Sequence, residues 1–157
     1  MIDLKIEMLN EEDMNVFVNQ FYFDDFYMKD KDDLLMIIRD IILKIDRRYH
    51  LNLSGFYKIK AYVNQKIGAF LNLIKIDDNE FTNEVDFRII IYKNEKFLLE
   101  TEEYNLCKEA TNRYYNGKFY IDIDEIDNCN KYLDMATIIY GDDVKKIMAR
   151  GKKIKRG

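Results

Sequence analysis

The sequence predicts an α+β protein, an antiparallel β-sheet with helices packed on one face. Three observations predict this class: one strongly amphipathic stretch, alternating apolar and polar segments on both sides of it, and turn signals that join those segments into hairpins. Segments that follow one another through short turns pair antiparallel, whereas parallel strands need long crossovers. The spacing of the segments therefore favours an antiparallel sheet.

The amphipathic stretch runs from Asp32 to Tyr49. Its apolar residues recur every three or four positions, and charged residues occupy the opposite side of the helix. Asp30 or Asp32 is placed to cap the first turn, and Arg47 and Arg48 suit the negative C-terminal end. Isoleucine has only modest helix propensity. Burial of the apolar stripe under strands must therefore stabilise this helix, at roughly 1.5–3 kcal/mol for each fully buried side chain.

Five strands are predicted around this helix. Alternation of period two indicates strands that bury one face, and short polar segments with Asn or Gly indicate the turns between them. The predicted strands are Ile2–Leu9 and Val16–Phe23 before the helix, and Phe56–Val63, Gly68–Ile76 and Val85–Tyr92 after it.

The C-terminal third is predicted to contain a second set of strands and helices. A strand over 97–102 followed by a short helix over 103–111 is favoured, and a single helix over 94–113 is the alternative. Asn116 and Gly117 form a strong two-residue hairpin signal before the alternating segment at 119–124. The end of the chain is predicted to form a helix over 128–141 that ends at Gly141, and a second helix that is capped by Asp142 and frays beyond Gly151.

The length of 157 residues predicts a single domain, 1–157, and the alternative is an amino-terminal domain at 1–78 with a carboxy-terminal domain at 84–157. The first residues are acidic and alternating, unlike a signal peptide, and no apolar run is long enough to cross a membrane. Cys107 and Cys129 have no CxxC spacing. We therefore expect a cytoplasmic protein without membrane association, cofactor or enzymatic activity.

Acidic residues form one candidate metal site. Asp122, Asp124 and Asp127 lie within one short segment, and hard cations bind several oxygen ligands. The spacing does not match a calcium-binding loop, so a solvated face with a helix N-cap is the favoured interpretation. His50 is the single histidine and has no partner motif of a catalytic triad. The two cysteines have no base placed beside them, so they are expected to be buried apolar residues.

The C-terminal segment is a candidate nucleic-acid contact. Its seven cations, with no acid among them, would attract phosphates or acidic protein surfaces. No recognised nucleic-acid motif accompanies them, and a solvated last helix is the alternative. The cations are Lys145, Lys146, Arg150, Lys152, Lys153, Lys155 and Arg156.

Several stretches resemble a known family of adaptor proteins. MIDLKIEMLNEEDMNVFV at 1–18, the helix at 33–49 and IKAYVNQKIGAFLNLIKID at 59–77 resemble the amino-terminal half of MecA-type adaptors, which deliver substrates to a Clp AAA+ unfoldase. KFYIDID at 118–124, KYLDMATIIYG at 131–141 and IMARGKKI at 147–154 are similar to the carboxy-terminal half. The family has a long acidic linker, whereas this chain has only DDNEFTNE between its halves.

The resemblance implies a non-enzymatic protein-binding adaptor or regulator. Its expected partner is another protein, a Clp unfoldase or a substrate of one. A nucleic-acid-associated protein that uses the basic C-terminal segment is the alternative. A third hypothesis is an enzyme that uses the acids of the 122–127 segment with a divalent ion.

Overall fold

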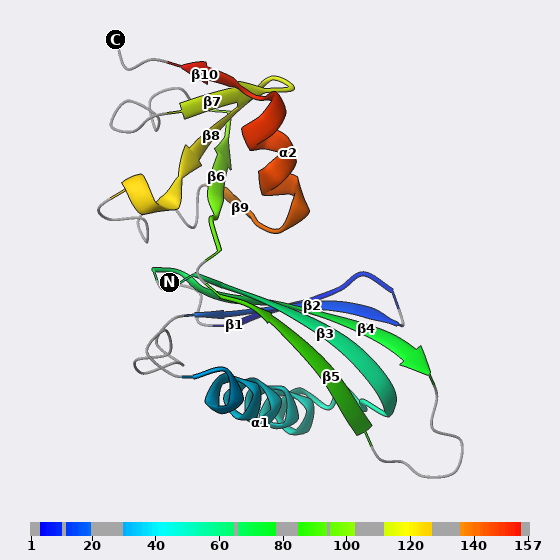
Figure 1. Cartoon of the computed structure of the whole chain (residues 1–157). Helices are drawn as coiled ribbons and strands as arrows, with labels where there is room; N and C mark the ends of the chain where they lie inside the picture. The colour runs from blue at the N-terminus through cyan, green and yellow to red at the C-terminus, as the bar shows by residue number, and fades with distance from the viewer. Residues whose placement is uncertain are drawn as a thin grey trace. The chain divides into compact units, whose positions relative to one another are not determined.

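The computed structural model describes residues 4–10, 12–19, 30–64, 66–77, 85–93, 95–102, 112–126 and 136–154. These residues form two α-helices and ten strands, arranged in two five-stranded sheets, which confirms the predicted α+β class. Contacts along the chain divide it into an N-terminal unit, Ile2–Lys93, and a C-terminal unit, Asn94–Gly157 (Figure 1). The organisation as a single domain stays a prediction.

The sheet of the N-terminal unit has the strand order β1-β2-β4-β3-β5. Neighbouring strands are antiparallel except β5, which runs parallel to β3 with Ile59 opposite Ile89. The strands are β1 (Leu4–Met8), β2 (Asp13–Asn19), β3 (Gly55–Asn64), β4 (Gly68–Asp77) and β5 (Val85–Tyr92).

Helix α1 (Lys31–Tyr49) covers one face of this sheet (Figure 1). Asp30 is the N-cap, because its carboxylate accepts a hydrogen bond from the backbone N–H of Asp33 at 2.9 Å. The buried stripe of α1 packs on every second residue of the strands, those on the sheet face toward the helix, as the sequence predicts. The stripe consists of Leu34, Ile38, Ile42 and Ile45, and it packs with buried residues of β2, β3, β4 and β5.

The sheet of the C-terminal unit has the order β10-β7-β8-β6-β9 and is antiparallel throughout. Helix α2 (Asp142–Arg150) packs on it through Val144 and Ile147. Asn116 and Gly117 turn the β7–β8 hairpin with positive φ at both residues, as the sequence predicts. The strands are β6 (Leu98–Thr101), β7 (Asn112–Tyr115), β8 (Lys118–Asp122), β9 (Thr137–Ile139) and β10 (Lys152–Ile154).

Two helix predictions near the C-terminus are wrong in part. A helix is predicted over 128–141, but Thr137–Ile139 within this range forms strand β9, which pairs with β6. The second predicted helix ends at Arg150, and the segment expected to fray forms β10 beside β7. The N-cap of α2 is Gly141, not Asp142. Both short segments form strands because they pair with strands that are distant in sequence. Local periodicity does not indicate such pairing.

Other predicted boundaries shift by a few residues. The strand predicted at 16–23 begins earlier, at Asp13, and is described as far as Asn19. Asn10 tightens the preceding turn, since its side-chain oxygen accepts hydrogen bonds from the N–H groups of Glu12 and Asp13. The short helix predicted over 103–111 lies outside the described residues.

Candidate functional site

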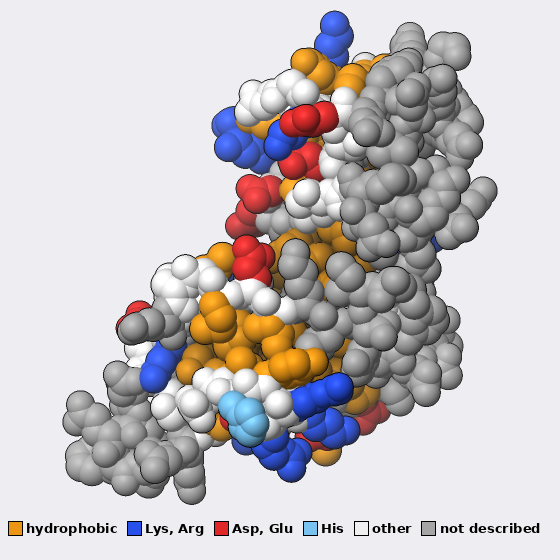
Figure 2. Space-filling view, turned by 180° about the vertical axis from the view of Figure 1, so that it is seen from behind, with side chains coloured by type: hydrophobic (Ala, Val, Ile, Leu, Met, Phe, Trp, Pro, Cys, Tyr) orange, Lys and Arg blue, Asp and Glu red, His pale blue; other side chains and the backbone are white. Residues whose placement is uncertain are grey.

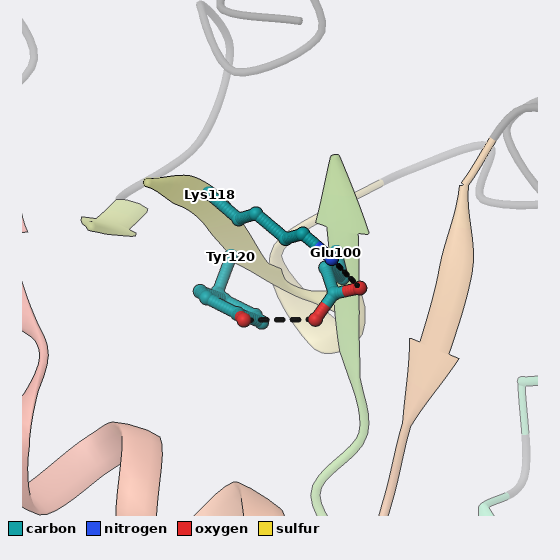
Figure 3. A network of polar contacts seen from close by, with 3 residues as sticks. All are labelled: Glu100, Lys118 and Tyr120. Carbon is teal, nitrogen blue, oxygen red and sulfur yellow. Dashed lines mark hydrogen bonds and ion pairs between the residues drawn. The ribbon is translucent and has the colours of Figure 1, made fainter. Parts of the chain in front are cut away.

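A polar network lies on the α2-facing side of the C-terminal sheet (Figure 3). Glu100 of β6 is directly opposite Tyr120 of β8, and Lys118 lies two residues before Tyr120 on the same face. The Tyr120 hydroxyl donates to Glu100 Oε2 at 2.8 Å, and Lys118 Nζ lies 3.2 Å from Glu100 Oε1. One carboxylate therefore holds both partners, one through each oxygen.

Tyr120 is the buried member of this network, with 5% of its surface exposed. Its burial, and then its hydrogen bond to the Glu100 carboxylate, raise the pKa of Tyr120 to about 12. The phenol is therefore protonated at neutral pH and acts as a donor. This chemistry suits a structural clamp between β6 and β8 rather than a proton-transfer group, whose pKa must lie near the working pH.

The acidic candidate residues are held by interactions within the chain. Asp122 Oδ1 accepts from the Asp124 N–H at 2.9 Å and caps the short 3₁₀ turn Ile123–Glu125. Asp122 Oδ2 lies 3.1 Å from Lys96 Nζ. Asp127 lies outside the described residues. Among the residues described, no group of three or more His, Cys, Asp or Glu side chains is arranged to hold a metal ion.

His50 ends α1 in the left-handed conformation, with φ of 53°. Its backbone N–H bonds the Asp46 carbonyl, and the Leu51 N–H bonds the same carbonyl. The structure thus gives His50 a role in turning the chain out of the helix. Cys107 and Cys129 lie outside the described residues.

The basic segment is split between α2 and β10. Its five described cations are exposed, and they are Lys145, Lys146, Arg150, Lys152 and Lys153. Lys145 Nζ is 4.0 Å from Asp142, and both side chains are largely exposed. Lys155 and Arg156 lie outside the described residues. On the face of the C-terminal unit seen in Figure 2, Lys and Arg side chains lie beside Asp and Glu side chains, so the coloured part of that face is mixed in charge.

Hydrophobic side chains also reach the surface of the N-terminal unit (Figure 2). Three exposed side chains of this unit, which we call the apolar end patch, are Leu9, Ile74 and Ile76, exposed by 56%, 43% and 54%. They share one end of the sheet, because the Leu9 N–H bonds the Asp13 carbonyl and Asp13 is the register partner of Ile74. Alternation from the core residue Leu73 places Ile74 on the sheet face away from α1.

The cross-strand neighbours of Ile74 on the next two strands are cations. Lys58 is the register partner of Ile74, and Arg88 is the partner of Lys58. Neither cation forms an ion pair with another described residue. This end of the sheet therefore presents exposed apolar side chains on β4 and in the β1–β2 turn, and cations on β3 and β5.

Sequence reasoning does not find the apolar end patch or the Glu100 network. The patch joins a turn residue to the end of a strand more than sixty positions later, and pairing through β2 alone brings them together. Local alternation assigns Tyr120 to an outer face, whereas it is buried beside Val144 and Ile147 of α2. The signal available in the sequence is the pair Ile74 and Ile76 at the end of the predicted 68–76 strand, on the opposite side from Leu71 and Leu73.

No helix of the described residues is long and apolar enough to cross a membrane. Comparison of the chain with protein-family models, with curated proteins and with solved structures found no match.

Proposed function

We propose that the protein is a non-enzymatic protein-binding adaptor or regulator that uses the apolar end patch. The observation that carries the proposal is the exposure of Leu9, Ile74 and Ile76 together at one end of the sheet. Exposed apolar groups that are contiguous and bordered by polar residues are typical of protein interaction sites. Complete burial of an isoleucine contributes about 1.5–3 kcal/mol, so a partner that covers the exposed half of Ile74 and of Ile76 gains about half of that from each.

The neighbouring cations define the chemistry of the partner. Lys58 and Arg88 extend the row beyond Ile74 without an acidic partner among the described residues. A segment that places apolar side chains on the patch and acidic side chains on these cations complements both. The resemblance of 1–18 and 59–77 to MecA-type adaptors suggests a Clp unfoldase, or one of its substrates, as the protein that carries this segment.

The test is a pull-down with the immobilised full chain from a lysate of the source organism. We expect the wild-type chain to enrich a Clp unfoldase or a protein bound to it. We expect Ile74→Glu/Ile76→Glu to reduce that enrichment at least about tenfold, because a loss of 1.4 kcal/mol already changes affinity tenfold. Met36→Glu is the matched control, since Met36 is 68% exposed on α1.

Two results would contradict the proposal. Equal enrichment by the wild-type chain and the double variant would remove the patch from the interaction. Absence of a Clp unfoldase and its associated proteins from the enriched fraction would remove the link to Clp-dependent proteolysis. Circular dichroism of each variant distinguishes lost binding from lost folding.

Nucleic-acid association is the second candidate function, and the exposure of five cations on α2 and β10 supports it. Cations that contact phosphates release counterions, so affinity falls with salt by a slope of about −0.7 to −0.9 per contact. We expect Lys152→Gln/Lys153→Gln to reduce that slope for a fluorescent single-stranded oligonucleotide. Lys44→Gln on α1 should leave it unchanged. Binding that is indifferent to salt, or to the double variant, would dismiss this function.

A further inference from the structure

In the described part of the chain the two sheets end in four edge strands, and one of them differs from the rest. Edge strands expose unpaired backbone groups, and proteins protect them by shortness or by charged side chains. β9 and β10 have three residues each, and β10 contains two lysines. β1 has five residues and alternates with charges. β5 has eight residues and ends in the run Ile89–Tyr92, without a charge.

No strand of the described residues pairs with the outer side of β5. β5 lies at the edge of the sheet, beyond β3 (Figure 1). The Phe87 N–H donates a hydrogen bond to the Asp86 carboxylate at 2.8 Å. This N–H therefore points away from β3, toward the outer side of β5. Successive residues of a strand direct their N–H and C=O groups alternately to the two sides. Ile89 and Ile91 therefore present theirs on the same outer side as Phe87.

We infer that β5 pairs antiparallel with β5 of a second copy of this chain, joining two N-terminal sheets into one. A twofold pairing satisfies two identical edges at once. The register of this pairing is limited by Phe87, Ile89 and Ile91, whose backbone N–H and C=O groups point outward. Residues of this kind must lie opposite one another in an antiparallel pair. Pairing centred on Ile89 places Ile89 opposite itself and Phe87 opposite Ile91 of the other copy.

Side chains on the face away from α1 favour this register over the one centred on Arg88. A register shifted by one pair, centred on Arg88, would place two arginines directly opposite each other, and like charges in that position are destabilising. In the register centred on Ile89, Arg88 lies opposite Ile90 of the other copy, and Asp86 lies opposite Tyr92. Tyr92 stacks on Tyr62 with ring centroids 4.9 Å apart, which leaves a phenol at the edge beside the incoming carboxylate.

Asp86 also explains how a free edge is protected. In the single chain its carboxylate accepts a hydrogen bond from the Phe87 N–H, so this donor is not free to pair with another strand. A rotation of that side chain toward Tyr92 of the second copy releases this N–H for the new ladder. The helix-facing side chains of β5 belong to the core under α1, so the joined sheet continues that core without requiring any of them to move.

The test is the mass of the full chain in solution, measured by light scattering after size exclusion and by sedimentation from about 1 to 100 µM, a range that brackets typical weak self-association. We expect a dimer for the wild-type chain. Ile90→Lys should give a monomer, because the introduced lysine would lie opposite Arg88 of the other copy. Arg88→Glu should remain a dimer, and the double variant Ile90→Lys/Arg88→Glu should regain the dimer through opposite charges.

Each other outcome overturns the inference. A wild-type chain that stays monomeric throughout the range rejects self-pairing. A dimer that survives Ile90→Lys uses another surface. A double variant that fails to regain the dimer, while its circular dichroism matches that of the wild-type chain, rejects the register centred on Ile89.

Discussion

Replacement of Ile38 by Asp is expected to unfold the N-terminal unit. Ile38 is fully buried in the stripe of α1, between the helix and the sheet. A carboxylate there has no cation among its core neighbours, and burial of an unpaired charge costs several kcal/mol or more. The total stability of a small protein is about 5–15 kcal/mol. Loss of most of the native circular dichroism at 25 °C is the expected measurement.

A milder substitution gives the size of this contribution. Ile38→Ala should reduce the free energy of unfolding by about 2–5 kcal/mol, since it removes buried methyl groups and leaves a cavity. Met36→Ala, on the exposed side of the same helix, should change it by less than about 0.5 kcal/mol. Equal midpoints for the two variants in urea would contradict the packing described for α1. Two separate transitions in the Ile38→Ala variant would also argue against a single domain.

Replacement of Glu100 by Ala is expected to reduce the free energy of unfolding by about 1–3 kcal/mol. The substitution leaves the buried Tyr120 hydroxyl without its acceptor, and an unsatisfied buried donor costs the full desolvation of that group. The lost pairing with Lys118 contributes less, because the lysine is 42% exposed. Urea unfolding of the wild-type and variant chains provides the measurement.

Two further variants separate the two interactions of Glu100. Glu100→Gln keeps an oxygen for the Tyr120 hydroxyl and loses only the attraction to Lys118, so a loss below about 1 kcal/mol is expected. The double variant Glu100→Ala/Tyr120→Phe removes donor and acceptor together, and its loss should be smaller than the sum of the two single losses. Strict additivity would show that the 2.8 Å contact contributes no coupling.

Much of the N-terminal unit is predictable from sequence because its signals are local. The stripe of α1, the alternation of β3 and β4, and the bounds Val85–Tyr92 of β5 follow from periodicity. The parallel pairing of β5 with β3 does not, since it depends on where the chain returns after β4. Periodicity also places Ile41 on the same stripe as Ile38, but Ile41 is only partly buried.

The C-terminal unit is less predictable because its strands are short. β9 and β10 have three residues each, so their own pattern hardly distinguishes strand from helix, and pairing with β6 and β7 decides their structure. The Asn116–Gly117 turn is the exception, since its positive φ angles require those residue types. The apolar end patch is unpredictable for a related reason: it is assembled from residues that only the strand order brings together.

The position of β4 between β2 and β3 has a consequence for how the N-terminal unit is made. β2 precedes α1, yet its partner on that side is β4, which follows both α1 and β3. As the chain leaves the ribosome, the β1–β2 hairpin and α1 must wait until β4 is synthesised before their apolar faces are covered. Such long-range closure slows folding compared with local hairpin formation. The β3–β4 hairpin joins strands that are adjacent in sequence and also provides the edge on which β2 pairs, so it is the expected nucleus on which the earlier segments assemble.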